Sequence, residues 1–147
     1  MITVKELLDQ KNQSIVSCQP SDNILLPLEL MRKHKVRSIL VIEDMQLKGI
    51  ITQGDCAIRV LLARLDPEHT TVESVMTAHP LAVDESYDLD QCMGIMSGKR
   101  LRHLPVLRNS EVVGVVSIGD LVNRLVEDQS SRIASLENYI IGHGITY

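Results

Sequence analysis

The chain has 147 residues and a mass of 16.4 kDa, enough for one ordinary domain or two very small ones. Hydrophobic residues make up 44% and charged residues 23%, typical of globular proteins, which excludes a disordered tail or a low-complexity linker. The net charge of −4 and the lack of Trp and Phe argue against a nucleic-acid binder with a basic surface or stacking aromatic side chains. No run of apolar residues approaches 18, and no signal-peptide core follows Met1, so we expect a soluble, cytoplasmic protein.

The cysteines and histidines form no pattern typical of a metal or redox site. Cys18, Cys56 and Cys92 are widely spaced in apolar surroundings, and no Cys-x-x-Cys occurs. The five histidines include no pair at helical spacing. We therefore expect three reduced thiols packed as small apolar groups, and no metal site.

The second half of the chain repeats the first at an offset of 65 positions. No gap is needed from Val16, which aligns with Leu81, to Val60, which aligns with Leu125. The segments that begin at Thr3 and Thr71 also match, but the first is separated from Val16 by three more residues than separate the second from Leu81. Identical pairs include Met31 and Met96, Arg37 and Arg102, Gly49 and Gly114, Gly54 and Gly119, Asp55 and Asp120, and Arg59 and Arg124. Two copies of about 60 residues are each marginal alone, so we expect them to pack about a pseudo-twofold axis with two related clefts between them.

Each copy has the pattern of a short helix, strand, helix, strand, strand and helix. In the first copy a capping box at residues 3–6 opens a helix, and residues 15–17 are extended. A helix starts at Ser21-Asp22, and Pro27 either lies in its first turn or kinks it. Strands at 37–43 and 47–52 flank a turn at 44–46, and a helix covers 55–65.

The second copy follows the same order after a linker at 66–70. A capping box at Thr70–Glu73 opens its first helix, residues 81–83 are extended, and Ser86 starts the next helix. Strands at 102–107 and 112–117 flank a turn at 108–111, and a helix covers 120–126. We expect domains at 1–65 and 71–127 and a helical tail at 128–147. The apolar tail residues Ile133, Leu136, Ile140 and Ile141 form one stripe along that helix, and Gly142 or Gly144 would end the helix.

The most closely repeated element is Gly49-Ile-Ile-Thr52-Gln-Gly-Asp55, matched by Gly114-Val-Val-Ser117-Ile-Gly-Asp120. A hydroxyl residue ends a strand, and an Asp follows three positions later at a helix start. This spacing is typical of a helix cap, which needs no ligand. It also suits a nucleotide, because a helix N-terminus attracts phosphate and a carboxylate can accept the hydroxyls of a ribose. Arg37 and Arg102 lie beyond the preceding helices, at the starts of strands. These two cations favour a nucleotide-binding role for the motif over a purely capping role.

These motifs resemble a tandem pair of cystathionine-β-synthase (CBS) domains, also called a Bateman module. The resemblance rests on the two Gly-x-x-(Thr/Ser)-x-x-Asp signatures, on Arg102-His103-Leu-Pro-Val106, and on Val75-Met76-Thr77. It covers residues 1–126, and Leu136-Glu-Asn-Tyr-Ile140 is similar to small stand-alone bacterial members. The resemblance implies an α/β (α+β) fold of two β-α-β-β-α repeats about a pseudo-twofold axis, followed by a C-terminal helix.

The resemblance also implies a regulatory sensor that binds AMP, ADP, ATP, NAD or S-adenosylmethionine in its inter-domain clefts and needs no cofactor. By position, Asp55 and Asp120 would bind ribose hydroxyls, and Thr52 and Ser117 would contact ribose or phosphate. Arg37, Arg102 and His103 would face phosphates. Residues 14–17, with Val16, and 79–81, with Pro80 and Leu81, would flank adenine. The second signature is the better site, because Gln53-Gly54 departs from similar members.

Two alternatives concern catalysis and assembly. No nucleophile elbow, phosphate-binding loop or His-x-x-x-His occurs, so we expect no enzyme. The resemblance favours a homodimer of two modules. The competing hypothesis is a structural dimerisation module with empty clefts, whose partner is another protein, because both signatures also work as caps.

Overall fold

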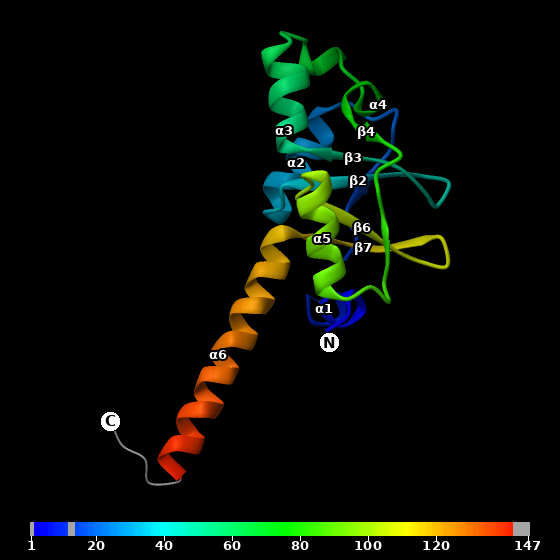
Figure 1. The fold of residues 1–147 in the computed structure, drawn as a ribbon. Coiled ribbons are helices and arrows are strands. Elements are labelled where there is room, and N and C mark those ends of the chain that lie inside the picture. The colour runs from blue at the N-terminus through cyan, green and yellow to red at the C-terminus, as the bar shows by residue number, and fades with distance from the viewer. Residues whose placement is uncertain (1, 12–13, 143–147) are drawn as a thin grey trace.

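The computed structural model describes residues 2–11 and 14–142, arranged as two α/β halves and a long C-terminal helix (Figure 1). The first repeat contributes α1 (Val4–Lys11), β1 (Ser17–Cys18), α2 (Leu25–His34), β2 (Ser38–Glu43) and β3 (Gln46–Thr52). Helix α3 (Gln53–Cys56) continues into the π-helical segment η1 (Ala57–Leu62), and the 3₁₀ turn η2 (Pro67–His69) follows.

The second repeat follows the order of the first, with one additional short strand, β4, after its first helix. It contributes α4 (Val72–Val75), β4 (Thr77–Ala78), β5 (Val83–Asp84), α5 (Leu89–Lys99), β6 (His103–Arg108), β7 (Glu111–Ser117) and α6 (Ile118–Gly142). The expected fold of two α/β repeats with a C-terminal helix is confirmed. Within the described residues, no helix is both long and apolar enough to cross a membrane.

Each repeat builds a sheet around one hairpin. β1 pairs parallel with β2, and β5 pairs parallel with β6, whereas β2–β3 and β6–β7 are antiparallel. Asp44 and Met45 turn the first hairpin, and Asn109 and Ser110 turn the second, all four with positive φ. Two-residue turns of this kind match the right-handed twist of the strands. They are shorter than the turns that the sequence pattern predicted.

Two helices begin later than their sequence indicated. α2 begins at Leu25 rather than at Ser21-Asp22, and Pro27 lies in its first turn, where backbone N–H groups have no helical partner. α5 is capped by Asp88 rather than by Ser86: the backbone N–H of Gln91 donates to Asp88 Oδ1 at 2.8 Å. The Thr70 capping box was also wrong, because the buried Thr70 hydroxyl donates to the Asp66 carbonyl at 2.7 Å and α4 begins at Val72.

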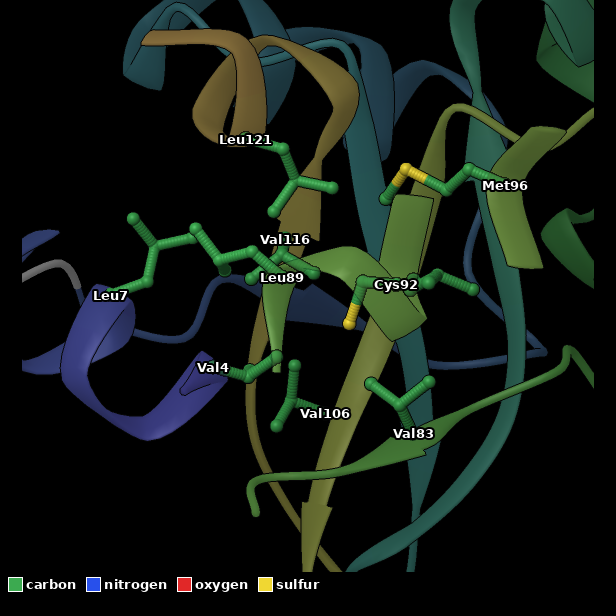
Figure 2. Close-up of a cluster of buried hydrophobic side chains, with 10 residues drawn as sticks. Val4, Leu7, Val83, Leu89, Cys92, Met96, Val106, Val116 and Leu121 are labelled. Carbon is green, nitrogen blue, oxygen red and sulfur yellow. The ribbon is translucent and has the colours of Figure 1, made fainter. Parts of the chain in front are cut away.

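The repeats exchange their first helices. Val4 and Leu7 of α1 pack in the core of the second half, against residues such as Val106 and Leu121 (Figure 2). Val72 and Val75 of α4 pack in the core of the first half, with Ile39, Ile51 and others. Each core is therefore completed by the opposite repeat, which joins the two halves and brings α1 beside β7.

Helix α6 does not end at Val126, where the sequence pattern placed the end of the second copy. It runs unbroken for 25 residues and extends away from the body (Figure 1). No Gly or Pro occurs between Gly119 and Gly142, so nothing in the backbone interrupts it. The predicted tail stripe begins on this same helix; Gly144 lies outside the described residues.

Candidate functional site

A cleft of about 720 Å³ lies between the two repeats. Its walls come from the end of α1, the segment before β1, the end of α2 with the start of β2, the start of β6, strand β7 and the first turn of α6. A volume of this size is within the range of small-molecule sites. The predicted site residues that line it are Val16, Arg37, Arg102, His103, Ser117 and Asp120.

The second signature forms a complete cap on α6. The Asp120 backbone N–H donates to Ser117 Oγ at 3.1 Å, and the Ser117 backbone N–H donates to Asp120 Oδ2 at 2.8 Å. The cap therefore uses one carboxylate oxygen, Oδ2, and holds the side chain in a single orientation at the cleft. A capping role and a ligand-binding role for Asp120 are compatible.

The structure adds a residue that the sequence pattern did not single out. Lys11 Nζ lies 3.0 Å from Asp120 Oδ2 and 3.3 Å from the Val115 carbonyl oxygen, and it lines the cleft. The pair joins residues 109 positions apart. A local motif carries no signal for such a contact. The one related signal in the sequence is that three more residues follow the segment beginning at Thr3 than follow the matching segment at Thr71.

His103 is enclosed in the same wall. Burial lowers the pKa of its imidazole, and the nearby positive charges of Lys11, Arg102 and Arg37 lower it further, while Asp120 acts in the opposite direction. The imidazole is therefore neutral at neutral pH. The cleft thus presents fixed cations from two repeats beside a neutral ring that can gain a proton.

The first signature is built in the same way but lies outside this cleft. The Asp55 backbone N–H donates to Thr52 Oγ1 at 3.1 Å, and the Thr52 backbone N–H donates to Asp55 Oδ2 at 3.0 Å. Arg59 Nε lies 4.0 Å from Asp55 Oδ1. Pro80 and Leu81 follow β4, which pairs with β3 through Gly49 and Ile50. None of the four residues predicted here (Thr52, Asp55, Pro80 and Leu81) lines the 720 Å³ cleft.

The fold and the cleft define a module of two exchanged α/β repeats with a cationic cavity between them. The family model for the CBS domain matches residues 2–61 and 72–127, so the chain belongs to the CBS domain family. The resemblance seen in the sequence is confirmed.

Known CBS-domain proteins are similar to most of this chain. A CBS-domain protein structure from Burkholderia ambifaria is 34% identical with a TM-score of 0.82, covering 87% of this chain and 96% of that one. The mitochondrial CBS domain-containing protein CBSX3 of Arabidopsis thaliana is 27% identical over 95% of this chain and 72% of its own length. The CBS domain pair of MJ0100, solved with 5′-methylthioadenosine and S-adenosyl-L-methionine, is 24% identical with a TM-score of 0.75, covering 88% of this chain and 98% of that one.

Proposed function

We propose that this protein is a regulatory module that binds an adenosine ligand in the cleft at Asp120 and has no catalytic activity of its own. The observation that carries the proposal is the convergence on one cleft of the Ser117–Asp120 signature, two arginines and a neutral histidine. Adenosine ligands in the related MJ0100 structure support the ligand class.

The residues around the cleft suit the parts of a nucleotide. Asp120 Oδ1, the oxygen that the cap does not use, would accept ribose hydroxyl donors. Arg37, Arg102 and His103 would donate to phosphate oxygens. The segment Ser14–Val16, which lines the opposite wall, would flank the base. By pseudo-symmetry, we propose Thr52, Asp55, Pro80 and Leu81 as parts of a second, related site.

A thermal-shift series with AMP, ADP, ATP, NAD and S-adenosylmethionine tests the function. A ligand at 100 times its dissociation constant stabilises the protein by about 2.7 kcal/mol, which is several degrees for a chain of this size. We expect Asp120→Asn to keep the hydrogen bond from the Ser117 backbone N–H through its amide oxygen and to lose the ligand-induced shift. Asp88→Asn is the control, because Asp88 is also a carboxylate in a capping box, at the N-cap of α5 and outside the cleft.

A structural dimerisation module with empty clefts is the second candidate. It is favoured by the completeness of both caps, which satisfy the backbone of α3 and α6 without any ligand. In that case no adenosine compound shifts the melting temperature of nucleotide-free protein, and Asp120→Asn changes only stability.

We also propose that the module forms a homodimer in the cytoplasm. The dimer is supported by apolar side chains exposed on η1 and α6, among them Leu61 at 78% and Val126 at 58%. Cytoplasmic location is supported by the three free, buried cysteines, since disulfides are rare in that compartment. Burial raises the pKa of Cys18 to about 12 and those of Cys56 and Cys92 to about 11, so all three stay protonated.

A further inference from the structure

Lys11 enters the cleft because α1 is longer than its counterpart. The equivalent helix α4 has four residues and ends at Val75, whereas α1 has eight and ends at Lys11. The three additional residues of the first repeat amount to nearly one helical turn. The longer α1 thus brings the Lys11 ammonium group to Asp120, whereas the ion pair that the structure gives Asp55 is with Arg59 of the same helical segment.

The two signature carboxylates accordingly meet different cations. Asp55 faces Arg59, four residues along its own helix, at 4.0 Å. Arg124 stands at the corresponding position beyond Asp120, but it pairs with Gln10, Glu127 and Asp128 instead. Lys11, from the other end of the chain, is thus the cation paired with Asp120, and it meets that carboxylate at Oδ2, whereas Arg59 approaches Asp55 at Oδ1.

This pairing sets the charge of the cleft. Among the described residues that line the cleft, Asp120 is the one carboxylate, and Lys11 neutralises it at 3.0 Å with both side chains about four-fifths covered. The remaining charged residues of the wall are Lys35, Arg37 and Arg102. These three side chains are exposed and partly screened by water, but their shared positive sign still favours an anion in the cleft over a cation.

Lys11 also keeps a donor for the ligand. An ammonium has three N–H groups, of which one points to Asp120 and one to the Val115 carbonyl. The third can reach an oxygen of a molecule in the cleft without breaking the ion pair. A phosphate there would receive a charge-assisted hydrogen bond.

We infer that Lys11 is a specificity-determining residue that makes the Asp120 cleft select phosphate-bearing adenosine ligands over neutral adenosine and over the cationic sulfonium of S-adenosylmethionine. The inference rests on the proposed function for the ligand's adenosine part. The anion preference itself follows from Lys11 and its neighbours.

Calorimetric titration of the full chain with AMP, adenosine, S-adenosylmethionine and inorganic pyrophosphate tests the inference. We expect the wild type to bind AMP at least tenfold more tightly than adenosine or S-adenosylmethionine. Lys11→Met keeps the length of the apolar stem and removes the charge, so it should weaken AMP and pyrophosphate by about 10- to 100-fold and leave adenosine nearly unchanged. Lys11→Arg should restore most of the AMP affinity. Lys48→Met, outside the cleft, is the matched control.

The outcomes separate this inference from the proposed function. Equal affinity of AMP for the wild type and Lys11→Met would overturn the specificity role of Lys11 and keep the adenosine-binding function. Tighter binding of S-adenosylmethionine than of AMP to the wild type would have the same meaning. If pyrophosphate binds in a Lys11-dependent way and no adenosine compound binds, the anion-selecting role of Lys11 is supported and the adenosine-binding function is wrong. If no compound binds, both fail.

Discussion

His103 couples the cleft to pH. Its imidazole pKa lies below the ordinary value of 6.5 in the folded protein, because of burial and the nearby charges of Lys11, Arg102 and Arg37, with Asp120 opposing. Between the folded and unfolded pKa values the unfolded chain binds more protons. His103 therefore supports the fold fully above pH 6.5, and this support is lost as the pH falls through the folded pKa.

We expect the melting temperature of the unliganded protein to fall between pH 7.5 and pH 5.5, and to fall less in His103→Gln. Differential scanning calorimetry at both pH values measures the difference. His34→Gln is the control, since His34 is an exposed histidine at the rim of the same cleft. Identical pH profiles for wild type and His103→Gln would show that burial does not disfavour the charged ring.

Individual residues show how far the sequence predicted the site. Asp120, Ser117, Arg102 and Arg37 were predicted as site residues because the repeat marks them at a fixed offset, and the structure places all four on one cleft. Lys11 was not, since its contact with Asp120 depends on how α1 packs against the opposite repeat. Periodicity predicts a buried face and is silent on which distant core that face enters.

At the scale of elements, the capping residue decides where α5 begins. Asp88 and Gln91 exchange hydrogen bonds at 2.8 and 3.0 Å, whereas Ser86, which the sequence pattern favoured, lies before the helix. Asp88→Ala should lower the free energy of unfolding by about 1 kcal/mol through loss of the cap. Ser86→Ala should change it by less than about 0.5 kcal/mol, as for an ordinary surface substitution. Urea denaturation compares the two, and an equal loss in both variants would place the helix start at Ser86.

The closing helices of the two repeats diverge for a reason visible in the chain. After η1 the backbone turns at Arg64, which has a φ of 59°, and Asp66-Pro67 starts the linker. The corresponding stretch of α6 has no such residues and continues to Gly142. The same repeated pattern thus yields a short helix beside the linker and a long one that extends away from the body.

In the whole molecule, the exchange of α1 and α4 joins both halves, and the cleft exists only because both are present. The helices that follow the two signatures lie along the same side of the body, at the left edge of Figure 1. Leu61 on η1 and Val126 on α6 occupy equivalent positions of the two repeats and are both exposed. An isologous dimer would bury these equivalent apolar positions of both subunits in one interface.

Light scattering at micromolar concentration should therefore give a mass near 33 kDa, twice that of the 16.4 kDa chain. Leu61→Asp together with Val126→Asp should reduce it to about 16 kDa, because burying two unpaired carboxylates in an apolar interface is costly. Met45→Asp is the control: Met45 is 73% exposed at the tip of the first hairpin, away from these helices. A wild-type mass near 16 kDa, or one that stays at 33 kDa in the double variant, would show that this helical face is not the interface. A mass several times larger would replace the dimer with a higher oligomer.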